Sequence, residues 1–167
     1  MAKLIKKHKT AVFVQGSEEK YVRIHHAPEL NRQMNPQTED YDYIGDEYAT
    51  TEVTAYKPAE DFSVKTFKGY PDFDLVYAMY KARAIGADAH RRVLTVFIFD
   101  ELAEGKYYAE EEDATITVNE FTASDSSISF SVAHNGTPSI GYATIEDGVP
   151  VFTEGKPDSS AQDEQDP

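Results

Sequence analysis

Alternation of apolar and polar residues is the strongest pattern along the chain, and it predicts strands. The segment "ATITVNEF" (114–121) places Ile116 and Val118 between threonine and asparagine, and "SSISFSV" (126–132) alternates apolar residues with serine. A period of two turns one face toward a core and the other toward a polar environment. Two half-buried strands are therefore expected here, and their polar faces of serine and threonine carry no charge.

Further strands are expected nearer the N-terminus. Segments 9–15 and 20–26 flank "GSEE", which is typical of a hairpin turn. β-Branched and aromatic residues fill segment 50–67, which is interrupted by Pro58. Because proline cannot donate a hydrogen bond to a neighbouring strand, Pro58 predicts an edge, a bend or a bulge.

One strand and one helix are expected to form the centre of the core. Segment 92–100, "RVLTVFIFD", is almost continuously apolar, which is typical of a strand covered on both faces. Its expected cover is a helix over about 71–85, because Pro71 suits a first helical position and Gly86 can end the helix. Apolar side chains at helical spacing form one stripe on this helix: Phe73, Val76, Tyr77, Tyr80 and Ala84.

Two segments differ from this pattern. Segment 27–49 contains two prolines and a glycine, and it is expected to be a long irregular loop of the kind that usually carries function. The C-terminal segment is polar, acidic and free of aromatic residues, so it is expected to be disordered. The expected organisation is a basic arm at 1–9, one β domain at 10–153, and an acidic tail at 154–167.

Acidic residues outnumber basic residues by 30 to 16, which gives a formal net charge of −14. Such a surface repels nucleic-acid phosphates. Four lysines gather in the N-terminal arm, where a solvated terminus is one interpretation and a docking segment another. There is no cysteine. Neither a signal peptide nor an apolar stretch of membrane-spanning length is recognised, so we expect a soluble chain that does not bind membranes.

Sequence motifs for chemistry are weak. An EF-hand alignment that starts at Asp40 places Ile44 and Thr51 where calcium ligands are needed, and only a looser carboxylate site remains open. His25 and His26 are adjacent on an expected strand and point to opposite faces, so they cannot easily share a metal ion. Acidic runs at 100–101 and 110–113 are interpreted as solvated faces. We expect no catalytic, metal or cofactor site, and no enzyme activity.

The stretch "EDYDYIGDEY" (39–48) and the segments around it contain three blocks that resemble a known protein family. The block N-P-x-T-E-x-Y-x-Y-I occupies 35–44, "TTEVTAYKP" occupies 50–58, and "GADAHRRVLTVFIFD" follows the expected helix at 86–100. In this order and over about 10–150, the chain resembles the major tail tube proteins of long-tailed, non-contractile bacteriophages.

The resemblance implies a fold, an assembly and a location. The fold would be a β-sandwich or barrel of two packed sheets with one flanking helix. Six subunits would form a ring, and stacked rings would form the tail tube through which double-stranded DNA passes during ejection. The implied partners are further copies of the chain and initiator, tape-measure and terminator proteins. The protein would be assembled in the host bacterial cytoplasm and reside in the virion tail.

Within this framework the tyrosine-rich loop is interpreted as an inter-subunit contact. Tyrosine packs apolar area while it keeps a polar tip, which favours interfaces. The neighbouring carboxylates would keep the monomer soluble and could meet basic groups such as the N-terminal lysines. The alternative is an exposed acidic loop with incidental tyrosines. The candidate contact residues are Tyr41, Tyr43, Ile44, Tyr48, Asp40 and Asp42.

Acids on or beside strands are candidates for the channel wall, and they are Glu52, Asp61 and Glu120. A wall of this kind would keep the DNA duplex from adhering. The alternative function is a monomeric β-barrel ligand-binding module in which the tyrosine-rich loop acts as a lid. That alternative predicts a monomer with an apolar pocket.

Overall fold

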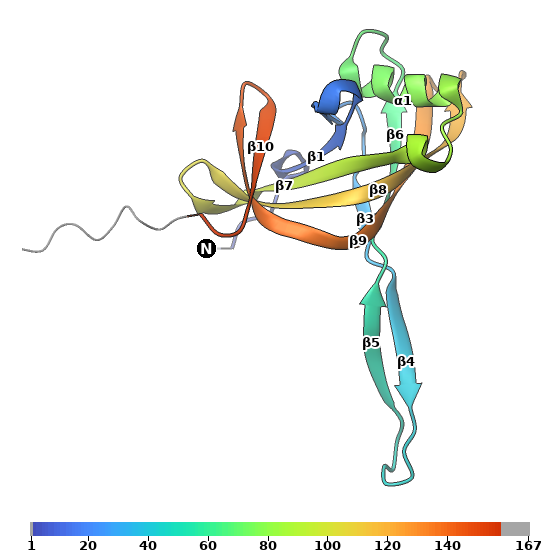
Figure 1. Ribbon diagram of the computed structural model, residues 1–167, viewed down its shortest axis with the longest axis vertical. Helices are drawn as coiled ribbons and strands as arrows, with labels where there is room; N and C mark the ends of the chain where they lie inside the picture. The colour runs from blue at the N-terminus through green and yellow to red at the C-terminus, as the bar shows by residue number, and fades with distance from the viewer. Residues whose placement is uncertain (1, 158–167) are drawn as a thin grey trace, which may run out of the picture.

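The computed structural model describes residues 2–157 and contains one large antiparallel sheet with a helix on it (Figure 1). The strand order is β2-β1-β7-β8-β9-β6-β3, with β10 paired to β9, and a separate two-stranded sheet is made by β4 and β5. The elements are η1 Lys7–Lys9, β1 Thr10–Gln15, η2 Ser17–Glu19, β2 Tyr21–Arg23, β3 Asn31–Gln33, β4 Pro36–Tyr41, β5 Thr50–Tyr56, β6 Ala59–Lys65, α1 Pro71–Ala82, η3 Gly86–Ala89, β7 His90–Ala103, β8 Lys106–Thr122, β9 Ser127–Glu146 and β10 Val149–Glu154.

Strands β8 and β9 form the spine of the sheet. The first part of β9 pairs with β6, whereas its last part pairs with β10, so one strand serves two different neighbours. Irregularities interrupt the β8–β9 register between Glu111 and Asp113 and between Val118 and Glu120. Bulges bend a strand and increase its twist, which lets these two strands curve as they cross the molecule (Figure 1).

The helix covers one face of the sheet. Its buried side chains Phe73, Val76 and Met79 pack with Phe62 and other apolar residues of β1, β6, β7, β8 and β9. Strands β6, β8 and β9 contribute alternate residues, as period-two alternation predicts. The alternating patterns at 114–121 and 126–132 therefore point their apolar residues at the helix.

The helix ends earlier than the sequence predicts. It stops at Ala82 because Arg83 adopts a left-handed conformation with φ of 49° and donates its backbone N–H to the carbonyls of Met79 and Tyr80. Gly86, which we expected to end the helix, instead opens the short turn η3. Tyr80, which we expected in the apolar stripe, is 45% exposed and stacks on Phe121.

A second apolar cluster lies against the other face of β1 and β7. It contains Phe13, Leu94 and Val96, and it is covered by Ala143 and Phe152 of the β9–β10 hairpin. Both faces of β7 are therefore buried over residues 93–96, which confirms the prediction for the apolar run. The second layer over this cluster belongs to the same sheet, because the C-terminal part of β9 pairs with β10 and packs against it.

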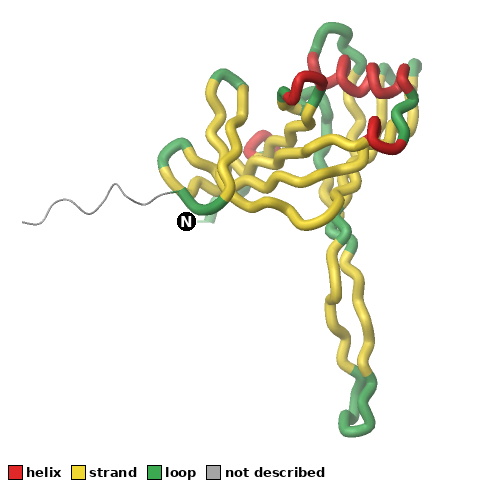
Figure 2. Tube along the Cα trace, in the orientation of Figure 1, coloured by secondary structure: helices red, strands yellow, loops and turns green. Residues whose placement is uncertain are grey.

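Segment 27–49 is more regular than we predicted. It contains β3 and β4, and β4 pairs with β5 in a hairpin that projects from the body (Figures 1 and 2). Pro58 lies between β5 and β6, where the chain leaves the hairpin and enters the main sheet, as its predicted role in a bend requires. Its carbonyl accepts a hydrogen bond from the backbone N–H of His134.

The mainly β fold class with one flanking helix is confirmed. The large sheet does not close into a barrel, because β2 and β3 lie at its two ends without pairing to each other. Strand β10 extends to Glu154, the first residue of the expected tail. Most of that tail, residues 158–167, lies outside the described residues.

Replacement of Gly141 by alanine is expected to destabilise the second cluster. A Cβ at Gly141 would overlap the carbonyl oxygen of Thr153 and lie 2.8 Å from Glu154 Cα, so β10 would have to move away from β9. Overpacking of this kind typically costs about 1–3 kcal/mol. Chemical unfolding should show this loss for Gly141→Ala. The control Gly45→Ala, which meets no atom within 4 Å, should unfold like the parent; equal stability of all three would contradict the close packing.

Candidate assembly site

The β4–β5 hairpin is a two-stranded ribbon without a sheet to support it. Among residues 2–157, its strands pair only with each other, from Pro36 opposite Tyr56 to Tyr41 opposite Thr50. Every residue of β5 is exposed, including Val53 and Tyr56. Isolated two-stranded hairpins are at best marginally stable in water. The ribbon therefore leaves both of its faces uncovered by the described residues of its own chain.

The tip of the hairpin presents apolar side chains. The backbone N–H of Asp46 bonds to the carbonyl of Tyr43 at 2.9 Å, which makes a turn with Ile44 and Gly45 at its corners. Ile44 is fully exposed, and Tyr43 and Tyr48 are 60% and 77% exposed. Tyr41 is half-buried and stacks on Tyr43 with ring centroids 6.0 Å apart. The structure thus gathers the four proposed apolar contact residues at one end of the ribbon.

The same hairpin is strongly acidic. Residues 34–56 contain no lysine or arginine and six carboxylates: Glu39, Asp40, Asp42, Asp46, Glu47 and Glu52. Glu39 lies directly opposite Glu52 across the two strands. Like charges in that position destabilise a hairpin. Asp40 is partly satisfied, because Thr51 donates its hydroxyl to it at 2.6 Å.

Buried charges lie where the hairpin joins the body. Arg32 of β3 is the last charged residue before the hairpin, and Glu60 of β6 is the first acid after it. Arg32 donates to Glu60, to the hydroxyl of Thr95 and, at 3.2 Å, to Glu110. The Glu60 side chain is completely buried, so this pair is shielded from water. The ionic contact ties the two ends of the hairpin to each other and to the central strands.

His134 and Glu112 complete this cluster. His134 Nε2 donates to Glu60 at 3.1 Å, and its Nδ1 lies 3.5 Å from Glu112. Burial raises the pKa of Glu60, but the hydrogen bond from His134 and the charge of Arg32 outweigh it and leave the pKa below its ordinary value. Burial dominates at Glu112, whose pKa is raised. The prediction that the acidic run at 110–113 is a solvated face is therefore wrong for Glu112.

Sequence reasoning did not identify this cluster, although a signal was present. Glu60 shares strand parity with Phe62 and Val64, so alternation alone would have turned it toward the core. An acid in a core position requires a buried partner, and Arg32 supplies it. The same parity rule would have placed His134 beside Val132 on the inner face of β9.

Polar side chains cover the outer face of β6, β9 and β8. Asn119 donates to Ser131 and Ser131 donates to Asp61, both at 2.7 Å, so a chain of hydrogen bonds crosses three strands. Glu120 lies opposite the outward-facing Ser129 and accepts a bond from Thr122. Asp61 and Glu120 thus share one sheet face. Glu52, the third proposed wall residue, lies apart from them on the hairpin.

The adjacent histidines His25 and His26 are bound to the start of the helix by Asp72. Asp72 at the start of α1 accepts the backbone N–H groups of His25 and His26 and also contacts the His26 ring at 3.0 Å. Burial raises the pKa of Asp72, and these backbone and ring hydrogen bonds lower it further than burial raises it. Within residues 2–157, no group of three or more potential ligands is arranged to hold a metal ion. Over the same residues, no helix is long and apolar enough to span a membrane.

Comparison with known proteins identifies the fold. No protein-family model matches the chain, and no curated protein matches its sequence. A chain in the tail of an empty GTA particle, solved with C6 symmetry, aligns with a TM-score of 0.51 and 11% identity over 81% of this chain and 98% of that chain. A chain of the PVC sheath–tube complex, an extracellular contractile injection system in its extended state, aligns with the same TM-score and identity over 87% and 95%.

The chain has the fold of proteins from tail and tube assemblies. At 11% identity the likeness is one of fold, and it covers nearly the whole of both aligned chains. It agrees with the mainly β architecture and with the resemblance seen in the sequence. The roles of individual residues rest on the geometry of this chain.

Loss of Arg32 is expected to show how far the buried charges support the fold. Removing one partner of a buried ion pair typically costs about 3–5 kcal/mol, and Arg32→Met should lose that much stability at pH 7. The folded-state pKa of Glu60 is below the ordinary value of 4.5, so its carboxylate stabilises the fold above that pH and this contribution is lost as the pH falls. The cost of Arg32→Met, measured by urea unfolding, should therefore shrink at pH 4.

Arg92 provides the matched control for this measurement. Its side chain is 51% exposed and contacts Glu111 and Asp113 at 3.5 and 3.7 Å. Exposed pairs contribute about 0–1 kcal/mol, so Arg92→Met should change stability little. If Arg32→Met cost no more than Arg92→Met, or cost as much at pH 4 as at pH 7, the buried pair would not have the role assigned to it.

Proposed function

We propose that this chain is a structural tail tube protein that assembles into hexameric rings, which stack into a tube for double-stranded DNA. The observation that carries the proposal is the β4–β5 hairpin, a ribbon whose apolar tip has no partner among the described residues of its own chain. The fold likeness to a C6-symmetric tail supports an assembling role. The proposed location is the virion tail, with assembly in the host cytoplasm and without enzyme activity.

Contacts between subunits are the proposed role of the hairpin. Tyr43, Ile44 and Tyr48 are exposed, and they belong to the segment between β4 and β5. That segment forms the far end of the hairpin, which extends beyond the body of its own subunit (Figure 1). Aromatic and apolar anchors that become buried dominate interface energies. The open edges at β2 and β3 are further sites for pairing between subunits, because an edge strand presents unpaired N–H and C=O groups.

Passage of DNA is the proposed role of the assembled channel. The net charge of −14 disfavours adhesion of phosphates. The polar outer face that contains Asp61 and Glu120 is a suitable channel wall, because its hydroxyl and amide groups bond to one another and its acids repel the duplex. Glu52 would contribute only where the hairpin reaches the channel. Initiator, tape-measure and terminator proteins are the proposed partners, and the proposed tail is of the long, non-contractile type.

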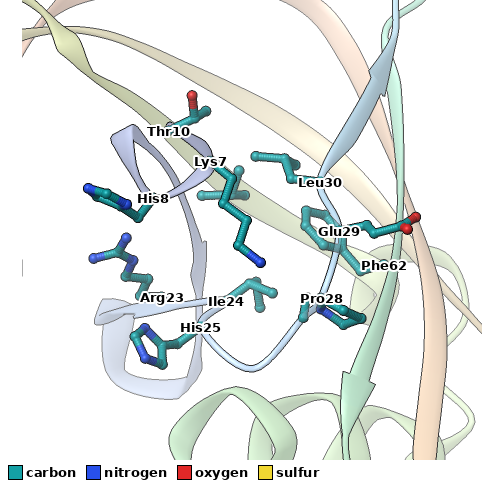
Figure 3. A pocket seen from close by; sticks show the side chains of 12 residues that line it. Lys7, His8, Thr10, Arg23, Ile24, His25, Pro28, Glu29, Leu30 and Phe62 are labelled. Carbon is teal, nitrogen blue, oxygen red and sulfur yellow. The ribbon is translucent and has the colours of Figure 1, made fainter. Parts of the chain in front are cut away.

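The alternative, a monomeric β-barrel module with a tyrosine-rich lid, is less well supported. The large sheet is open rather than closed into a barrel. The tyrosine-rich tip lies far from the body, at the end of the hairpin, and does not cover the pocket in Figure 3. A lid would need to fold back over such a pocket.

Assembly is the first test. Concentrated protein, alone or with a tail-tip nucleus, should form six-fold rings or tubes in sedimentation and electron microscopy. Tyr41→Ser/Tyr43→Ser/Ile44→Ser should remain folded and lose assembly, since each lost anchor typically costs about 2 kcal/mol or more. Thr50→Ser/Thr51→Ser/Thr54→Ser on the same hairpin is the control and should assemble. A parent protein that stays monomeric even with a nucleus would refute the tube, and normal assembly of the anchor variant would refute the role of the tip.

Retention of DNA is the second test. Each phosphate neutralised by a basic residue adds salt-dependent affinity, with a slope of about −0.9 per contact. Assembled tubes should therefore release duplex DNA at moderate salt. Asp61→Lys/Glu120→Lys should assemble and retain duplex DNA, and added salt should restore release. Tubes of the parent protein that held DNA strongly would contradict a non-adhesive channel.

A further inference from the structure

A small pocket lies between the start of the chain, β2 and the segment that leads into β3 (Figure 3). Its volume is about 190 Å³, and its apolar lining includes Val12, Ile24, Leu30 and Phe62. An engineered apolar cavity of about 150 Å³ admits benzene. This pocket therefore has room for one branched or aromatic side chain.

Basic side chains surround the same pocket. Lys7, His8, Arg23 and His25 all contribute to its lining. In Figure 3 the Lys7 side chain extends across the opening, while the carboxylate of Glu29 points away from it. Within residues 2–157, neither Lys7 nor Arg23 takes part in an ion pair, whereas Arg32 and Arg92 each contact two carboxylates. The pocket combines an apolar interior with positive charge that has no partner in the described part of the chain.

We infer that this pocket receives the hairpin tip of a second copy of the chain. The inference rests on the proposed function and names the acceptor for the contact proposed there. Ile44, at the corner of the tip turn, enters the apolar interior, and Asp42 and Asp46 on either side meet Lys7 and Arg23. The tip has the complementary chemistry, an apolar point flanked by acids on a hairpin without bases.

The occupant must come from another molecule. The hairpin leaves the body beyond β3 and β6 and points away from it, so a subunit does not place its own tip in its own pocket (Figure 1). Complementary charge at both sites favours encounter in one orientation and disfavours contact between two acidic tips. The repulsion of Glu39 by Glu52 is also reduced where basic groups of the acceptor lie near the hairpin.

Cross-linking tests the contact directly, because the chain contains no cysteine and any disulfide must join introduced residues. Ile44→Cys full-length chain is mixed with Pro28→Cys chain, which carries its cysteine at the exposed rim of the pocket. The control partner is Ile85→Cys chain, with an exposed cysteine away from the pocket. Under mild oxidation, we expect the Ile44–Pro28 mixture to form at least about tenfold more of the mixed dimer than the control mixture.

Sedimentation of the parent protein under the same conditions distinguishes failure of the pocket contact from failure of assembly. Assembly without preferential cross-linking at position 28 would overturn the pocket as acceptor and leave the proposed function intact. Absence of both assembly and cross-linking would overturn both. Preferential cross-linking supports the inference whatever the symmetry of the final assembly.

Charge reversal provides an independent test. Lys7→Glu/Arg23→Glu should weaken association by about tenfold or more, since the acids of the tip then meet acids. Asp42→Lys/Asp46→Lys introduced into the same chain should restore most of it. Lys20→Glu/Lys68→Glu makes the same change in net charge outside the pocket and should have a smaller effect. Equal loss in this control, or failure of the compensating changes to restore association, would overturn the inference.

Discussion

A two-stranded ribbon cannot bury a face of its own, and this constraint governs the rest of the molecule. Between β3 and β6, more than twenty residues form a hairpin whose side chains are almost all exposed. The hairpin adds acidic charge and apolar surface without adding to either apolar cluster. The two apolar clusters of the body form without it, and the hairpin itself is held together by its own cross-strand pairing.

The body holds the base of the hairpin with a buried group of charged residues around Arg32 and Glu60. An ion pair in the core rarely stabilises a fold more than well-packed apolar residues would, but it does define geometry, because removal of either partner leaves an uncompensated charge. Arg32 and Glu60 lie at the two strands that lead into and out of the hairpin, and Thr95 and His134 hold them against the central strands. This arrangement restricts the direction in which the hairpin leaves the sheet. A projecting element is useful for assembly only if its direction is fixed.

Much of the fold follows from the spacing of apolar residues, and the exceptions have physical causes. The alternating strands, the doubly covered β7 and the helix are all evident in the sequence, since each buries a regular stripe. Strand β4 lies in segment 27–49, which was expected to be an irregular loop because it contains Pro28, Pro36 and Gly45. Strand β5 lies in segment 50–67, which was expected to be strand. The early helix end escaped prediction because Arg83, not a glycine, takes the left-handed conformation. The structure brings the proposed contact residues together at one end of the hairpin, and their role stays a prediction. The pocket is assembled from distant segments and leaves no local pattern.

If the pocket receives the tip as inferred, the separation of these two sites on the body also sets a polarity of growth. A tip-to-pocket contact that the same two molecules do not make in both directions is heterologous, and it leaves one tip and one pocket of the pair free. A subunit that has donated its tip can still accept the tip of a further copy in its own pocket. Such a chain of contacts either closes into a ring or continues without limit, and its two ends are different. An assembly built in this way has a direction, so one end can be started and the other capped by different molecules.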